Sequence, residues 1–265
     1  MTGPTPLLDC FRRGEMPREA RLLAARGALA PRASEQLAIL VLLVDDRDGE
    51  IRTAAVETLD RIPVEPLQGF LARPDVPAGL REFFADRGVF PAAIPPVESD
   101  DPLVDTDGES AGDADVPAQD EETEQLTVVQ RIAKMGFSER LKAAMKGTRE
   151  MRAMLIRDAN KMIAAAVLSS PKLAEPEVEA FAKMANVSDD VLRTISNNRA
   201  WMKNYNIALS LAKNPKTPVG TSLHIMPRLN DRDLAQLSVD RNIPEPLRIA
   251  ARKKVVAKQS GRERE

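Results

Sequence analysis

The chain has 265 residues, enough for one or two domains, each with a modest apolar core. Apolar residues are 43% of the chain and aromatic residues only 3%, so Leu, Ala, Val, Ile and Met must form the core. This composition suits packed helices better than a sheet. The net charge is −2, and the single cysteine, Cys10, excludes a disulfide framework and favours a reducing compartment.

No stretch of the sequence approaches the roughly 18 apolar residues that a membrane-spanning helix needs. The N-terminus has no basic region followed by an apolar run, so it does not resemble a secretory signal. We therefore expect a cytoplasmic protein without a membrane span.

Charge divides the sequence into three parts. Residues 1–93 contain 12 basic and 14 acidic residues, 94–126 contain 12 acidic and no basic residues, and 127–265 contain 26 basic and 14 acidic residues. The middle part has few large apolar side chains and cannot bury enough surface to offset the entropy of ordering it. The prediction is an N-terminal helical domain (1–93), a disordered acidic linker (94–126) and a basic C-terminal helical domain (127–265). We also expect the linker to contact the basic domain in a salt-sensitive way.

The first part contains two clear helix signals. The apolar run 37–44 is typical of a buried helix. In 50–59, Ile51, Ala54, Ala55 and Leu59 form one stripe of a 3.6-residue helix.

The last part contains further helices, and no segment has the period of two that a strand would show. Pro176 can occupy the first turn of a helix whose stripe is Val178, Phe181, Ala182 and Ala185. Ser188 is a typical N-cap, as is the pair at 230–231. A final helix is expected over 247–255.

These helices recur at a regular spacing. Ser170-Pro171 and Asn214-Pro215 each close a helix and lie 44 residues apart, and polar breaks recur every 40 to 42 residues. A period of about 40–47 with two helices per unit is typical of HEAT and armadillo repeats.

The segment 45–55 resembles the second half of a bacterial HEAT-like repeat. The block through 198–205 and 214–218 is similar to an uncharacterised bacterial family of variant helical repeats. The resemblance extends over 17–88 and 127–257, and implies an all-α fold, an α-solenoid of HEAT-like repeats, without implying an activity. Unlike classical HEAT units, these interrupt the second helix with Asn-Pro or Ala-Arg-Pro.

The sequence contains no recognised catalytic or cofactor motif. It has neither a GxG dinucleotide fingerprint nor a phosphate-binding loop. Cys10 and the single histidine, His224, lie in different halves and are expected to be packing side chains, not a zinc site or a Cys–His pair. We expect no catalytic, metal or cofactor site, although an enzyme without a known motif stays an open alternative.

Two clusters are candidate partner-binding surfaces. The first holds the only Trp and the only Tyr beside amide and basic side chains, which are common interface anchors: Asn198, Arg199, Trp201, Lys203 and Tyr205. The alternative is that Trp201 and Tyr205 pack between repeats. The second cluster is basic: Arg248, Arg252, Lys253 and Lys254. Its alternative is a solvated last helix.

Together these patterns predict a non-catalytic scaffold or adaptor that binds another protein through a helical-repeat surface. The alternative is nucleic-acid binding through the basic C-terminal part, modulated by the acidic linker.

Overall fold

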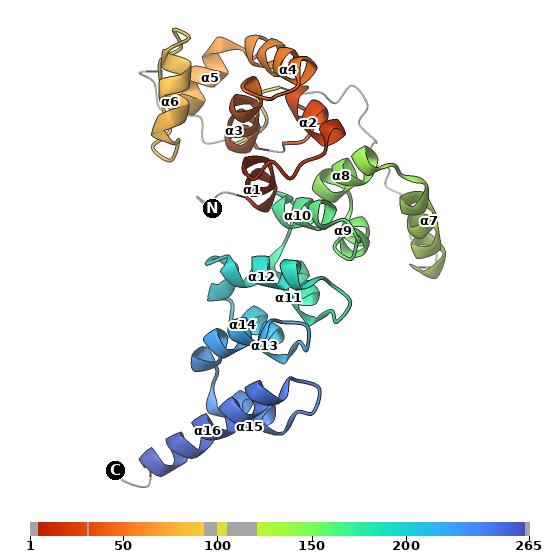
Figure 1. Ribbon diagram of the computed structural model, residues 1–265, viewed down its shortest axis with the longest axis vertical. Coiled ribbons are helices and arrows are strands. Elements are labelled where there is room, and N and C mark those ends of the chain that lie inside the picture. Colours follow the sequence, from red (N-terminus) through yellow and green to blue (C-terminus); the bar gives the residue numbers. More distant parts are fainter. Residues whose placement is uncertain (1–4, 31, 93–99, 105–120, 263–265) are drawn as a thin grey trace. The chain divides into compact units, whose positions relative to one another are not determined.

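The computed structural model describes residues 5–30, 32–92, 100–104 and 121–262, with the side chains of 128–257 in the last range. All secondary structure in these ranges is helical, with sixteen α-helices and two 3-10 helices (Figure 1). The prediction of an all-α protein is therefore confirmed. None of the described helices combines the length and hydropathy that crossing a bilayer would need.

The chain forms two compact units. The N-terminal unit contains Thr2–Leu155 and Ala165–Lys172, and the C-terminal unit contains Ile156–Ala164 and Leu173–Glu265, so the division falls within α10. The N-terminal unit contains these helices: α1 (Pro6–Arg12), α2 (Arg18–Ala25), α3 (Ala33–Val44), α4 (Gly49–Asp60), α5 (Val64–Leu71), α6 (Ala78–Ala85), α7 (Glu121–Lys134), α8 (Phe137–Lys146) and α9 (Arg149–Leu155). The C-terminal unit contains these: α11 (Glu175–Lys183), α12 (Asp189–Asn197), η1 (Trp201–Lys203), α13 (Tyr205–Lys213), α14 (Val219–Ile225), η2 (Met226–Arg228), α15 (Asp231–Val239) and α16 (Glu245–Arg262). α10 (Lys161–Ser169) contributes to both.

The core of the N-terminal unit is centred on α3. This helix packs against α1, α2, α4 and α6, which explains its nearly continuous apolar sequence. Both helices expected in this part of the chain are present, α3 over the apolar run and α4 over the stripe. In α4 the stripe residues Ile51 and Ala55 are fully buried, as the 3.6-residue period requires.

Part of the segment expected to be a disordered linker is folded against α3. The Gln36 side chain accepts hydrogen bonds from the Leu103 and Val104 N–H groups (2.9 and 3.2 Å) and donates one to the Val104 carbonyl (3.0 Å). The Asp100 carboxylate accepts from the Ser34 backbone and hydroxyl (3.2 and 3.0 Å).

The linker prediction is therefore wrong for residues 100–104. The segment lacks large apolar side chains, but hydrogen bonds with side chains of α3 hold its backbone in place. α7 likewise begins inside the expected linker, at Glu121. The remaining linker residues, 94–99 and 105–120, lie outside the described part of the chain.

The boundary between the units also differs from the expected one. α7, α8 and α9 belong to the N-terminal unit, where α8 packs against α2. The Leu7 N–H donates to the Ser169 hydroxyl (3.0 Å) and ties the end of α10 to α1. The expected boundary followed the change in net charge, whereas the observed one follows buried contacts.

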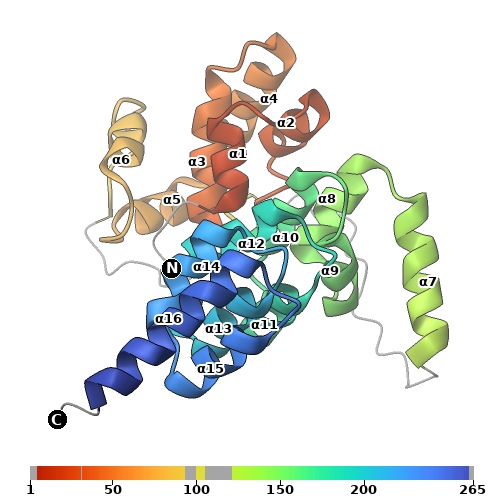
Figure 2. The same ribbon diagram turned by 60° about the horizontal axis from the view of Figure 1, so that its bottom comes forward.

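Within the C-terminal unit the helices form two sets of three. α13 packs against α11 and α12, α16 packs against α14 and α15, and α13 contacts α14 (Figure 2). Each set thus has three helices, where two per period were expected, and one helix was not expected from the sequence. This helix is α14, a seven-residue helix whose Gly220 and Thr221 give no apolar stripe.

Several details of the C-terminal helices follow the sequence signals. The Ser188 hydroxyl accepts from the Val191 N–H (3.4 Å) at the start of α12, and the Asn230 side chain accepts from the Asp233 N–H (2.8 Å) at the start of α15. The expected stripe of α11 is correct except at Ala185, because the helix ends at Lys183 and Ala185 is exposed.

Candidate binding groove of the C-terminal unit

A groove of about 440 Å³ opens where the end of α12 and η1 face α14 and η2. We call it the α12–α14 groove. Its lining combines polar, basic and apolar side chains: Ser196, Asn197, Arg199, Met202, Gly220, Thr221, His224, Ile225 and Arg228.

The short connection between α12 and α13 forms one wall of this groove. The Asn198 side chain accepts from the Ala200 and Trp201 N–H groups (3.0 and 3.3 Å), which turns the chain into η1. Trp201 and Met202 are then buried, each 7% exposed. Arg228 donates to the Met202 carbonyl and links η2 to η1 across the groove.

The formal charge of the groove comes from two arginines, Arg199 and Arg228. Two arginines and one histidine line it, and none of its lining residues is acidic. Arg199 and His224 are exposed, and within the described part of the chain neither has a hydrogen-bond or ion-pair partner. These two side chains are therefore available to a ligand.

The first predicted cluster is largely used to hold the fold. Tyr205 donates to the Asp233 carboxylate (2.5 Å) and accepts from the Asn230 N–H (3.1 Å), joining α13 to the start of α15. Partial burial, together with that carboxylate, raises the pKa of the Tyr205 phenol. Trp201 is buried, which favours the packing alternative for this residue, whereas Tyr205 is exposed and contacts the next set of helices through its hydroxyl.

The other three residues of this cluster lie in different environments. Asn198 is half-buried in its cap, Lys203 is exposed at the end of η1, and Arg199 alone lines the groove.

The second predicted cluster lies on α16. Arg248 and Lys254 are half-buried, while Arg252 and Lys253 are exposed. Arg252 donates to the Ser238 carbonyl at the end of α15 (3.4 Å). None of the four lines the α12–α14 groove, so the two predicted clusters do not form one surface.

Sequence reasoning missed the half of the groove contributed by α14 and η2. His224 was expected to be a packing side chain, but it is exposed and its neighbour Ile225 is buried instead. Arg228 follows Pro227 in η2. One sequence signal could have indicated this side of the groove. A basic residue directly follows a proline that ends a helix, in a segment with weak helical periodicity.

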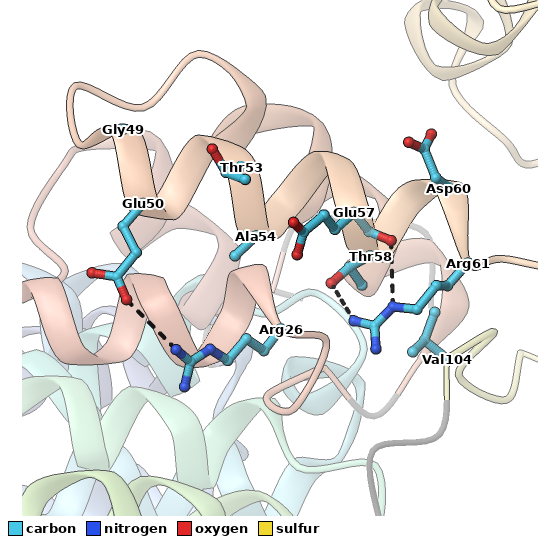
Figure 3. Close-up of a pocket in the computed structure, with 10 residues that line it drawn as sticks. All are labelled: Arg26, Gly49, Glu50, Thr53, Ala54, Glu57, Thr58, Asp60, Arg61 and Val104. Carbon is cyan, nitrogen blue, oxygen red and sulfur yellow. Dashed lines mark hydrogen bonds and ion pairs between the residues drawn. The ribbon is translucent and has the colours of Figure 1, made fainter.

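A larger and more open cavity, about 1110 Å³, runs along α4 in the N-terminal unit (Figure 3). Its charges are largely compensated. Arg26 forms an ion pair with Glu50 (3.6 Å), and Arg61 donates to the Glu57 carbonyl and the Thr58 hydroxyl (3.3 and 3.0 Å). We therefore expect the charge of a ligand to affect its binding less in this cavity than in the α12–α14 groove.

Cys10 is buried in α1 and lies in a different unit from His224. Among the described residues no group of three His, Cys, Asp or Glu side chains has the arrangement needed to hold a metal ion.

Comparison of the chain with protein-family models, with curated proteins and with solved structures found no match.

Proposed function

We propose that the chain is a non-catalytic scaffold or adaptor that binds another protein through the C-terminal unit. We further propose that its helices form HEAT/armadillo-like repeats of three helices each. Repeats of this kind bury their apolar stripes only by stacking on neighbours, which leaves an extended outer surface for a partner.

The spacing of equivalent helices supports the repeat assignment. α12 and α15 begin at Asp189 and Asp231, 42 residues apart, and α13 and α16 begin at Tyr205 and Glu245, 40 residues apart. In both sets the third helix packs against the first and the second.

Buried polar contacts at equivalent places give further support. The Ser170 hydroxyl, at the end of α10, donates to the Met145 carbonyl at the end of α8 (2.7 Å). The Asn214 side chain, 44 residues later, donates to the Ala182 carbonyl at the end of α11 (2.8 Å). In each case a polar side chain directly before a proline bonds the end of one α-helix to the end of the α-helix two earlier in the chain.

The single observation that carries the binding proposal is the α12–α14 groove, which lies between two successive sets of helices. Its exposed Arg199 and His224 have no internal partner among the described residues, so both side chains are free to contact a ligand.

The proposal is tested by affinity capture with the full chain as bait from a lysate of its source cells, followed by mass spectrometry. The expected result is one or a few proteins, retained after nuclease treatment, that rebind the purified chain in a fixed ratio in analytical ultracentrifugation. Retention of no protein, or loss of every captured protein after nuclease treatment, would overturn the proposal.

Nucleic-acid binding is the second candidate, favoured by the exposed basic side chains of α16 and by the net charge of +12 in residues 127–265. Contacts with phosphates would make the affinity fall steeply with salt. A gel-shift titration of the full chain with DNA and RNA at low and at high salt tests this candidate, and no shift at low salt would eliminate it.

A further inference from the structure

We infer that the α12–α14 groove binds an acidic peptide segment of the protein partner, with carboxylates on its basic side chains and one apolar side chain against Met202 and Ile225. This inference rests on the proposed function and specifies the chemistry of the partner.

The charges of the groove favour an anionic ligand. An ion pair with a single exposed arginine contributes little binding energy, because water screens the charges. Several basic side chains around one concave site attract an anionic ligand more strongly. Arg199 lies just before η1, Arg228 in η2 and His224 on α14, and all three line the groove. A guanidinium can bind a carboxylate through two parallel hydrogen bonds, which gives geometric selectivity as well as affinity.

The other lining residues favour a peptide over a nucleic acid. Met202 and Ile225 supply an apolar floor, and Ser196, Asn197 and Thr221 supply hydroxyl and amide groups that can bond a peptide backbone. Single-stranded nucleic acid is usually held by aromatic side chains that stack on its bases. No Phe, Tyr or Trp lines this groove, and the nearby Trp201 is buried.

Gly220 keeps the groove open on the α14 side. A Cβ built at this position meets no atom within 4 Å, so a larger side chain would enter free space and not displace a neighbour. Gly79, on α6 of the N-terminal unit, is equally unobstructed and provides a matched control.

The test is isothermal titration calorimetry of the full chain with the peptide acetyl-Asp-Glu-Leu-Glu-Asp-amide. We expect Arg199→Glu to weaken binding at least about tenfold, the loss of one charge-assisted hydrogen bond. Lys216→Glu makes the same change of net charge at an exposed site outside the groove and should retain most of the affinity. Gly220→Leu should abolish binding by filling the groove, whereas Gly79→Leu should leave it unchanged.

Circular dichroism confirms in each case that the variant is folded. The inference is overturned if the unmodified chain does not bind the peptide at millimolar concentration, or if Arg199→Glu and Lys216→Glu weaken binding equally. It is also overturned if a single-stranded RNA oligonucleotide binds more tightly than the peptide and Arg199→Glu removes that binding.

The result can be separated from the proposed function by repeating the affinity capture with Arg199→Glu. If this variant retains the same partner as the unmodified chain, the scaffold proposal stands and the assignment of the groove fails. If neither form retains a protein, the scaffold proposal itself fails.

Discussion

Glu35 is the most unusual ionisable residue of the described chain because it is buried on the first turn of α3. It is 3% exposed, and one carboxylate oxygen accepts a hydrogen bond from the Thr5 hydroxyl while the other has no partner among the described residues. The pKa of Glu35 is raised to about 7, mainly by burial and to a smaller extent by the charge of Asp100, while the Thr5 hydrogen bond and the charge of Arg32 act in the opposite direction. The folded chain therefore binds this proton more tightly than the unfolded chain.

The consequence is a loss of stability with rising pH. Below pH 4.5, its ordinary pKa, Glu35 is protonated in both the folded and the unfolded chain. As the pH rises from 4.5 to about 7 the unfolded chain loses this proton first, so the free energy of unfolding falls. This shift of the pKa corresponds to a loss of about 3 kcal/mol in the free energy of unfolding. We predict that Glu35→Gln removes this part of the pH dependence and is more stable than the unmodified chain at pH values above 7, as measured by urea unfolding on either side of the transition.

Glu65→Gln is the control, because Glu65 is exposed in the first turn of α5. It should leave the pH dependence as it is. An unchanged pH profile in Glu35→Gln would show that another group is responsible.

At the scale of elements, the sets of helices depend on buried polar side chains at their ends. Asn214 is 3% exposed, donates to the Ala182 and Met184 carbonyls (2.8 and 2.9 Å) and accepts from the Lys216 N–H (2.9 Å). Asn214 thus holds the end of α13 against the end of α11, where apolar contacts alone would not satisfy the backbone.

We predict that Asn214→Ala destabilises the C-terminal unit by about 2–3 kcal/mol, because two buried carbonyls would lose their donor. Thermal unfolding followed by circular dichroism measures the change. Asn242→Ala, at an exposed position between α15 and α16, should have little effect. Equal melting temperatures for the two variants would contradict this role of Asn214.

The helices were predictable from sequence wherever a cap or an apolar stripe is local, as with Ser188 before α12 or Ile51 and Ala55 in α4. α14 was not predictable in this way, because its position depends on contacts with α13 and α16 rather than on a stripe of its own. The docking of residues 100–104 could not be predicted either, since its partner Gln36 is 67 residues away from Leu103.

The same limit applies to the groove. Arg199 was among the predicted binding residues, but its neighbours across the groove, His224 and Arg228, come from the following set of helices. Charge and aromatic content of this region led to the prediction, but they could not show that Trp201 would be buried in the core while Arg199 is exposed in the groove.

For the whole molecule, the separation of charge along the chain is the dominant electrostatic feature. Residues 94–126 hold 12 acidic and no basic residues, against a net charge of +12 for residues 127–265. We propose that these opposite charges attract each other within the chain and that the acidic residues compete with an anionic ligand. Such attraction is screened beyond about 10 Å at 0.1 M salt.

We predict that replacing the six acidic residues of 105–120 with Asn and Gln strengthens binding to a heparin column at low ionic strength and makes no difference at high ionic strength. This replacement keeps the length of the chain and leaves the contacts of Asp100–Val104 intact. The control for net charge replaces six exposed acidic residues of the N-terminal unit with Asn and Gln: Asp45, Glu57, Asp60, Glu65, Glu82 and Asp86. If both proteins elute at the same salt concentration, the acidic segment has no special role.

The burial of Trp201 next to the α12–α14 groove has a practical consequence. It is the only tryptophan of the chain, and both Arg199, two residues before it, and Met202, directly after it, line the groove. The intrinsic fluorescence of the protein excited at the indole band therefore comes from this one place. Changes in its emission give a label-free optical signal from the wall of the groove, in a molecule whose other helices are spectroscopically silent at that wavelength.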